Sequence, residues 1–180
     1  YSGDTVSQFS IDISTGKLSP LAPFTTSTQS NPQYIAIHPN GKFLYVTNSS
    51  SNTVSQFNIS SNGLLSPMTI PTVSTGNAPK GILVIPDFLG NNYYCYVVNS
   101  GDDKIASYPV AIDGNLLVAG AYLSDCGNSS VDIASFKYYP YGVYLYSTNT
   151  GSNSVWQYKM NTSYYPGALD PLTPVSYIAG

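Results

Sequence analysis

The sequence predicts an all-β fold, a β-propeller built from four-stranded antiparallel blades. The first observation behind this prediction is a repeat: three similar segments end at Asn48, Asn99 and Asn149, which lie 51 and 50 residues apart. The second is composition, because the repeated segments are short, rich in β-branched and aromatic residues, and bounded by Gly, Pro, Asn or Ser. The third is that no stretch combines helical periodicity with helix caps.

Each repeat is expected to contribute four strands in a fixed order. The first strand ends in Pro and is expected at residues 33–39, 80–86 and 134–140. The second strand ends in the repeated Asn and is expected at residues 43–48, 94–99 and 144–149.

The third strand follows a short turn and is expected at residues 5–9, 53–57, 104–108 and 154–158. The fourth strand is led by a Gly turn and is expected at residues 16–20, 63–67, 114–118 and 167–171, each range counted from its Gly. The chain is therefore predicted to hold about four blades, three full and one partial at the N-terminus, in a single domain over residues 1–180. The approximate repeats are 1–30, 31–76, 77–127 and 128–180.

The partial first blade leaves the closure of the propeller open, because unpaired strand edges and apolar blade faces need cover. Three alternatives remain. The true chain is longer, or a small four-bladed ring tolerates the incomplete blade, or another copy of the chain completes it.

Charged residues are scarce: the 180 residues include six Lys and nine Asp, with no Arg and no Glu. A nucleic-acid binder needs clustered basic residues, so nucleic acid is excluded as a partner. An Arg clamp and catalysis by Glu are excluded as well. No apolar run approaches the length of a transmembrane segment. The chain lacks an initial Met and a signal-peptide core, which indicates a mature, processed or partial chain.

The inventory of catalytic groups is poor, and no catalytic, cofactor-binding or metal-binding residue is predicted. His38, the single His, precedes Pro and a turn, so a turn or packing role is expected. Asp102 and Asp103 lie in a hairpin between two strands, where Asp is a normal turn residue. Calcium would need six or more oxygen ligands. No Gly-x-Ser-x-Gly elbow is present.

Two cysteines, Cys95 and Cys126, fit no zinc pattern, because a structural zinc site needs four ligands. They form either one disulfide or two buried thiols, and their spacing does not decide between these alternatives.

Four Asn-x-Ser/Thr sequons are candidate N-glycosylation sites in an exported protein. They begin at Asn48, Asn58, Asn128 and Asn161. The first of them is also the repeated Asn of a strand end, where the turn itself can require it.

The aromatic residues fall into two groups. Tyr45, Tyr96 and Tyr146 repeat in the second strands, so packing between blades is expected. Others are less regular, and exposed aromatic rings could stack on sugars or form a protein contact. These candidate contact residues are Tyr138, Tyr139, Tyr141, Trp156, Tyr164, Tyr165 and Tyr177.

One repeat resembles a known family. Residues 45–48 read Tyr-Val-Thr-Asn and follow His-Pro-Asn-Gly-Lys at 38–42, which is similar to the YVTN family of β-propeller repeats. The resemblance implies a relation to lactonase-like seven-bladed propellers and to surface-layer proteins. Lactonase-type members use Glu, His and Arg around a central pocket, and this chain offers no Glu and no Arg. None of those site residues is therefore assigned here.

These observations lead to an expected function. A chain with little charge, many Tyr and no catalytic inventory is expected to be an extracellular or cell-surface structural protein, not an enzyme. It would associate with itself, as a surface-layer or filament subunit, and would need no cofactor. The alternative is a propeller module that binds a glycan or a protein, and the third possibility is a lactonase-like hydrolase.

Overall fold

The computed structural model describes residues 3–178, and every regular element in that range is a β-strand. In chain order the strands are β1 (Thr5–Ile11), β2 (Leu18–Ser27), β3 (Pro32–Ile37), β4 (Phe43–Asn48), β5 (Thr53–Ile59), β6 (Leu65–Ser74), β7 (Pro79–Pro86), β8 (Tyr93–Asn99), β9 (Lys104–Val110), β10 (Tyr122–Asp125), β11 (Ser130–Tyr138), β12 (Gly142–Asn149), β13 (Ser154–Met160) and β14 (Leu169–Ile178). Among the described residues, no helix is long and apolar enough to cross a membrane.

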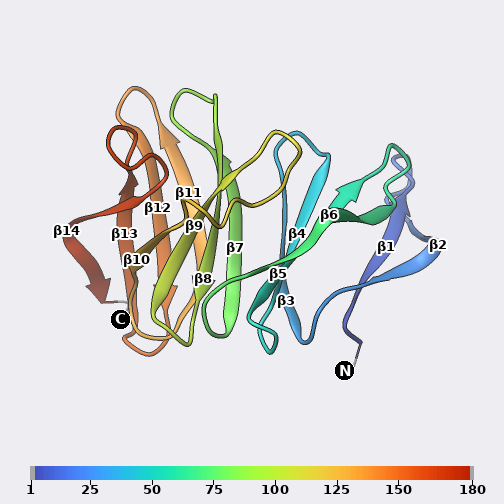
Figure 1. Cartoon of the computed structure of the whole chain (residues 1–180), viewed down its shortest axis with the longest axis horizontal. Coiled ribbons are helices and arrows are strands. Elements are labelled where there is room, and N and C mark those ends of the chain that lie inside the picture. Colours follow the sequence, from blue (N-terminus) through green and yellow to red (C-terminus); the bar gives the residue numbers. More distant parts are fainter. Residues whose placement is uncertain (1–2, 179–180) are drawn as a thin grey trace.

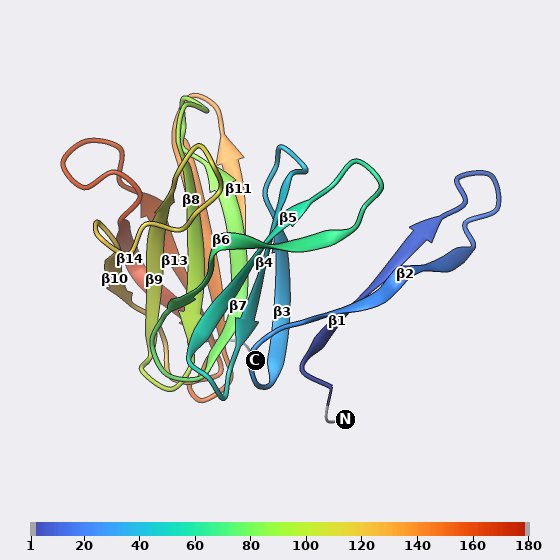
Figure 2. The same cartoon turned by 45° about the vertical axis from the view of Figure 1, so that its right-hand side comes forward.

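The strands form three four-stranded sheets and one two-stranded sheet. The four-stranded sheets have the orders β3-β4-β5-β6, β7-β8-β9-β10 and β11-β12-β13-β14. The two-stranded sheet, β1-β2, precedes them in the chain. The sheets stand next to one another along the long axis of the molecule (Figure 1), and the β1–β2 hairpin projects at one end (Figure 2). The predicted all-β propeller fold is confirmed, with three four-stranded blades and a partial N-terminal blade.

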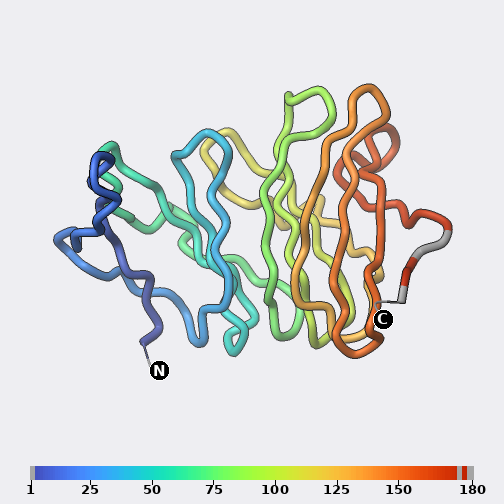
Figure 3. Tube along the Cα trace, turned by 180° about the vertical axis from the view of Figure 1, so that it is seen from behind, coloured from blue at the N-terminus to red at the C-terminus, as the bar shows by residue number. Residues whose placement is uncertain are grey.

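The first strand of each full blade lies on the same side of the molecule. β3 contacts β7, and β7 contacts β11. Seen from behind, these strands stand upright beside each other (Figure 3). The loops that follow them, together with the loops before the fourth strands, therefore gather at one end of the blades.

The hydrophobic core lies between the blades. One cluster joins Phe43 and Tyr45 of the second blade to Cys95 and Val97 of the third, and another joins the third blade to the fourth. Strand β4 is buried at every position because both of its faces are covered: Phe43 and Tyr45 face the third blade, and Leu44 and Val46 pack with Val6 of the first. Strand β12 has exposed side chains at Tyr146 and Thr148.

Buried Gln side chains connect successive blades. Gln8 Oε1 accepts a hydrogen bond from the main-chain N–H of Leu65 at 2.7 Å, and Gln56 Oε1 accepts one from Leu116 at 2.8 Å. Each Gln lies on the third strand of its blade and bonds the next blade just after its glycine turn. Gln8 bonds the first residue of β6, and Gln56 bonds Leu116, which follows the turn at Gly114. The same contact is thus made twice.

The fourth strand of the third blade departs from the predicted range 114–118. Val110 and Leu116 form only an isolated bridge, and regular pairing resumes in β10, from Tyr122. The outer strand is interrupted here because Ala121 N–H turns back to the Val118 carbonyl at 3.2 Å. This interruption leaves a hollow at the outer edge of the blade, lined by Val118, Ala121 and Leu123.

Candidate functional site

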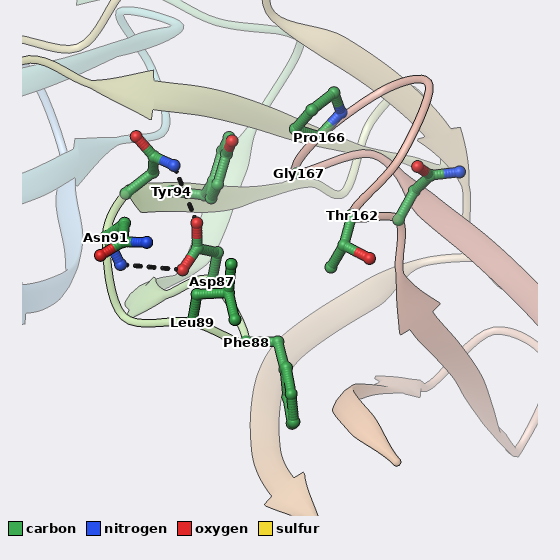
Figure 4. A pocket seen from close by; sticks show the side chains of 10 residues that line it. Asp87, Phe88, Leu89, Asn91, Tyr94, Thr162, Pro166 and Gly167 are labelled. Carbon is green, nitrogen blue, oxygen red and sulfur yellow. Dashed lines mark hydrogen bonds between the residues drawn. The ribbon is translucent and has the colours of Figure 1, made fainter. Parts of the chain in front are cut away.

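A pocket of about 310 Å³ opens between two loops of neighbouring blades. Loop 87–92 joins β7 to β8, and loop 161–168 joins β13 to β14. Figure 4 shows Asp87 and Tyr94 on one side of the pocket, with Thr162 and Pro166 facing them from the other side. The site therefore depends on the packing of the third blade against the fourth.

Asp87 organises the first loop. Its Oδ1 accepts hydrogen bonds from the main-chain N–H groups of Gly90 at 2.6 Å and Asn91 at 3.0 Å, and its Oδ2 accepts one from Asn92 Nδ2 at 2.8 Å. Burial opposes ionisation of this carboxyl, but the hydrogen bonds from these three residues outweigh it, so the pKa of Asp87 lies below its ordinary value. The pocket therefore contains a carboxylate at neutral pH.

Asn161 organises the second loop in the same way. Its Oδ1 accepts hydrogen bonds from the main-chain N–H groups of Ser163 at 3.0 Å and Tyr165 at 3.3 Å. Its Nδ2 donates to Asp170 Oδ2 at 3.0 Å. Side chains of Asn and Asp that bond nearby main chain hold a loop in one conformation. Thr162 is therefore presented to the pocket on a fixed turn.

Gly167 allows the two blades to approach at the pocket. Its φ is +87°, and a Cβ at this position would collide with the ring of Tyr94. The Tyr94 ring therefore lies against the bare main chain of Gly167. Burial raises the pKa of Tyr94, and the negative charge of Asp87 adds to this shift, so its hydroxyl stays protonated and can donate.

An aromatic pair lies at the edge of the pocket. Phe88 lines the pocket and stacks on Tyr139, with ring centroids 6.0 Å apart and ring planes 15° from parallel. Lys137 Nζ lies 5.5 Å from the centroid of Phe88. Parallel aromatic rings beside hydrogen-bonding groups are suited to a ligand with both an apolar face and polar edges.

The chemistry of the pocket favours binding of a neutral, hydroxylated ligand. Around the Asp87 carboxylate lie the neutral amides of Asn91 and Asn161 and the hydroxyls of Thr162 and Tyr94, and none of the described lining residues is cationic. A carboxylate with a lowered pKa and three hydrogen bonds is a weak general base, so Asp87 is better suited to orient a ligand than to remove its proton. Residues 3–178 include no group of His, Cys, Asp or Glu that could hold a metal ion.

His38 lies outside this pocket. It is buried, and its Nδ1 accepts a hydrogen bond from the main-chain N–H of Asn40 at 3.1 Å. Its ring packs on Phe43, with centroids 5.7 Å apart, and on Tyr93 of the next blade, at 4.2 Å. The geometry is that of a turn residue packed between blades.

The aspartates of the hairpin turns bind the linkers between blades. Asp103 Oδ1 accepts a hydrogen bond from the main-chain N–H of Ser129 at 2.8 Å. Asp102 accepts hydrogen bonds from the main chain and the side-chain amide of Asn77, both at 2.6 Å. Both aspartates therefore serve as turn residues.

The two cysteines are free, buried thiols. Cys95 belongs to the core between the second and third blades, and Cys126 to the core between the third and fourth. Of the two alternatives left open by the sequence, the structure has the pair of buried thiols.

The four sequons differ in accessibility. Asn48 is fully buried and its Nδ2 bonds Ser55 Oγ at 2.9 Å, so its amide is not accessible in the folded chain. Asn58 is half-buried and Asn128 is exposed. Asn161 lies in the second loop of the pocket, with its amide bonded to Asp170. Glycosylation of these residues stays a prediction.

The candidate contact aromatics do not form one surface. Tyr138, the last residue of β11, stacks on Tyr141 of the β11–β12 loop, with centroids 5.0 Å apart, and Tyr165 meets Tyr122 edge-on at 5.9 Å. The remaining rings are spread over other elements: Trp156 lies on β13, Tyr164 in loop 161–168 and Tyr177 on β14. Of the seven, Tyr139 comes beside the pocket, through its stack on Phe88.

The sequence did not single out Asp87, Asn91 or Thr162. A signal was present, since loop 161–168 is longer than its counterpart 60–64 in the second blade, and loop 87–92 is longer than 38–42. Loops that exceed the repeat often carry function on a regular scaffold.

Comparison with known proteins places the chain in a family. Residues 2–163 match the family described as "Lactonase, 7-bladed beta-propeller". No curated protein sequence matches the chain.

Solved structures share the fold. A candidate 6-phosphogluconolactonase from Bacteroides fragilis is 20% identical, with a TM-score of 0.76, over 97% of this chain and 49% of that one. The periplasmic gluconolactonase of Pseudomonas aeruginosa is 17% identical, with a TM-score of 0.71, over 100% of this chain and 55% of that one. A candidate 6-phosphogluconolactonase from Bacteroides uniformis is 19% identical, with a TM-score of 0.73, over 95% and 51%. The chain spans about half the length of these structures.

The family match corrects the predicted function. The expectation of a non-catalytic structural subunit that assembles into a surface layer or filament is wrong, because the matching family is one of lactonases. The lactonase-like hydrolase, ranked third from the sequence, agrees better with this finding. The absence of Glu and Arg excludes catalysis by those two residue types, and it does not exclude an enzyme that uses other groups. The lactonase-like part of the predicted resemblance is confirmed: the chain belongs to the lactonase family of seven-bladed β-propellers.

Proposed function

We propose that this chain acts in a lactonase-type propeller that hydrolyses a neutral, unphosphorylated sugar lactone. The observation that carries the proposal is the family match over residues 2–163. In this reaction water adds to the lactone carbonyl, the ring C–O bond breaks, and the released oxygen takes up a proton to give the open hydroxy acid.

The pocket between loops 87–92 and 161–168 is the proposed binding site for the sugar part of the substrate. Asp87 accepts a hydrogen bond from a sugar hydroxyl, and Tyr94 and Thr162 contribute hydroxyl groups opposite it. Phe88 offers its ring to the apolar face of the sugar. These residues bind and orient the substrate, and because Asp87 is a weak base, we assign it no proton transfer in the reaction.

The electrostatics of the pocket support a neutral substrate over a phosphorylated one. The Asp87 carboxylate repels a phosphate group, and the sequence contains no Arg to bind one in a bidentate manner. Lys137, near Phe88, is directed at the ring rather than lining the pocket.

A hydrolysis assay tests the proposal. Purified protein is incubated with glucono-δ-lactone near neutral pH, and acid release is followed with a pH indicator against a buffer blank. We expect a saturable rate above the blank. Asp87→Asn should raise KM more than it lowers kcat, since it weakens binding and not a chemical step. A rate equal to the blank at every lactone concentration would refute the proposed activity.

A second candidate is a sugar-binding module without turnover, which the parallel Phe88–Tyr139 stack favours. Calorimetric titration with glucose, a neutral sugar that has no lactone to hydrolyse, separates the two. Saturable binding that Phe88→Ala abolishes, combined with no hydrolysis, would favour the binding module.

Two finer predictions join the proposal. The repeats are of the YVTN type, as residues 45–48 indicate, and the protein is exported to the cell surface or beyond. The scarcity of charge and the four sequons support export. The intact mass of protein from its native source tests it, because attached glycans add to the mass of the polypeptide.

A further inference from the structure

A second pocket lies one blade boundary before the Asp87 pocket and repeats its position. The Asp87 pocket lies between the loop after β7 and the loop before β14. The second pocket, of about 280 Å³, lies between the loop after β3, at residues 38–42, and the end of β9, at residues 110–112. Asn91 and Asn92 line both pockets, so loop 87–92 is the wall that they share. We call the second one the His38 pocket.

The same packing contact shapes both pockets. A Cβ on Gly114 would collide with the ring of Phe43, just as a Cβ on Gly167 would collide with the ring of Tyr94. Phe43 lines the His38 pocket and Tyr94 lines the Asp87 pocket, each at the same place in the second strand of its blade. The two pockets therefore have a common frame, and they differ in the side chains that each blade adds to it.

His38 presents an unused hydrogen-bond donor to its pocket. Its Nδ1 accepts a hydrogen bond from the Asn40 N–H at 3.1 Å, so the neutral imidazole carries its proton on Nε2. Nε2 has no hydrogen-bond partner among residues 3–178. His38 is only 4% exposed, yet Nε2 is not one of the unpartnered polar atoms that are sealed from solvent. The small accessible surface of this buried ring therefore includes its N–H donor, and His38 lines the pocket.

The other walls of the His38 pocket are aromatic or aliphatic. The rings of Phe43 and Tyr93 line it and hold the imidazole between them, at centroid distances of 5.7 and 4.2 Å. Val110 and Ile112 line it from the next blade, and the Ile112 side chain is fully exposed. A buried donor in an otherwise apolar pocket is suited to a ligand with one acceptor on an apolar body.

None of the described residues that line the His38 pocket carries a formal charge at neutral pH. Burial lowers the pKa of His38, so its imidazole is neutral there. Asp87 lies on the other side of the shared loop, where its carboxylate accepts a hydrogen bond from Asn92 Nδ2 at 2.8 Å. An anionic ligand would therefore meet no cation in the pocket and a carboxylate behind its wall.

We propose that the His38 pocket binds a small neutral molecule in which an apolar ring bears a carbonyl oxygen. The oxygen accepts the hydrogen bond from His38 Nε2, and the ring lies against Tyr93 and Ile112. A carbonyl suits the site because it accepts a hydrogen bond without bringing a donor that would need a partner among apolar walls. The proposal is independent of lactone hydrolysis in the Asp87 pocket, because no residue of loop 161–168 takes part.

The test uses acetophenone as the probe and toluene as its matched control, because toluene keeps the ring and lacks the carbonyl. His38 is the single histidine of the chain, so labelling with isotope-enriched histidine gives nitrogen NMR signals from one imidazole. We expect acetophenone to shift the Nε2 signal in a saturable way and to shift Nδ1 much less. Toluene should bind about fivefold more weakly, which is the effect of one neutral hydrogen bond. Benzoate should also bind more weakly than acetophenone, because the pocket offers its charge no cation.

Three variants locate the binding, with affinity followed at the Val110 methyl groups. His38→Phe removes the donor and keeps a flat ring, and it should make acetophenone bind no better than toluene. Ile112→Ala shortens an exposed wall of the pocket and should weaken both probes several-fold. Leu123→Ala is its matched control, since it shortens an exposed side chain outside the pocket and should change neither affinity.

The comparison of probes on the wild-type chain is decisive even if a variant fails to fold. Equal affinity for acetophenone and toluene would overturn the proposal, and so would an Nε2 signal that does not respond to acetophenone. Tighter binding of benzoate than of acetophenone would overturn it as well, because the site would then be one for anions. Unchanged acetophenone affinity in folded His38→Phe would show that the donor is not used.

Discussion

Tyr45 of the second blade donates its phenolic hydrogen to the main-chain oxygen of Gly114 in the third blade, with 2.6 Å between Oη and O. The next boundary repeats this contact, since Tyr96 donates to the Gly167 oxygen at 2.9 Å. Tyr146, the third member of the series, is 37% exposed. A side chain that repeats once per blade therefore joins each blade to the turn of the next one.

Removing this hydroxyl should destabilise the protein only where a following blade receives it. Tyr45→Phe leaves the Gly114 oxygen buried without its donor, and we expect the free energy of unfolding to fall by about 1–3 kcal/mol. Tyr146→Phe is the matched control, because its hydroxyl is at an exposed position and its loss should change stability by less than about 0.5 kcal/mol. Urea unfolding followed by fluorescence measures both. Equal effects of the two substitutions would contradict the role assigned to Tyr45.

Gly167 should tolerate a side chain much less well than Gly16, although both have positive φ in the turn before a fourth strand. A Cβ at Gly167 meets the ring of Tyr94, whereas a Cβ at Gly16 has nothing within 4 Å. We expect Gly16→Ala to cost about 1 kcal/mol from backbone strain alone. Gly167→Ala should cost clearly more, and it should also weaken sugar binding, because Tyr94 lines the pocket.

Thermal unfolding of the two alanine variants, together with the lactone assay on each, measures this difference. If a folded Gly167→Ala variant kept the wild-type KM for the lactone, the turn at Gly167 would not affect substrate binding. That result would count against the proposed site.

Much of the fold could be predicted from sequence because a repeat reports the same structure several times. The recurrence of Asn48, Asn99 and Asn149 showed where the second strands end, and the turn residues around them limited where each strand could begin. The outer strand of the third blade could not be predicted, because its position depends on a turn at Val118–Ala121 that has no counterpart in the other repeats.

The candidate site was harder to predict, because it is formed by non-repeating loops of two different blades. Asp87 and Thr162 are far apart in the chain, and only the packing of the blades brings their loops to one pocket. The sequence also reads Asn99 as a copy of Asn48, yet Asn48 is bonded through its Nδ2 and Asn99 through its Oδ1, which accepts from Thr75 Oγ1.

His38 should make the stability of the protein depend on pH in the mildly acidic range. Burial lowers the pKa of His38 below its ordinary value of 6.5, so the unfolded chain binds a proton at a higher pH than the folded chain does. The stabilisation is complete above the unfolded pKa and is lost as the pH falls through it. The slope should not exceed about 1.4 kcal/mol per pH unit for one proton.

Urea unfolding at a series of pH values from 7.5 to about 5 measures this slope, in a range above the pKa of a typical carboxylate. His38→Gln keeps an acceptor for the Asn40 N–H and should flatten the curve. A slope that persists in His38→Gln would assign the effect to another group.

The thiols of Cys95 and Cys126 should be unreactive in the folded protein. Burial raises the pKa of Cys126 to about 11, and the full burial of Cys95 raises its pKa as well, so little thiolate forms at pH 8. Ellman's reagent should therefore label neither thiol at an appreciable rate in the native chain, and both in guanidinium without reductant. Cys126→Ala should reduce by one the number of thiols labelled in the denatured protein, which shows that Cys126 is one of the two labelled residues. A denatured count of zero for the wild type would mean that a disulfide joins the two residues, and rapid labelling of one native thiol would mean that the core around it opens.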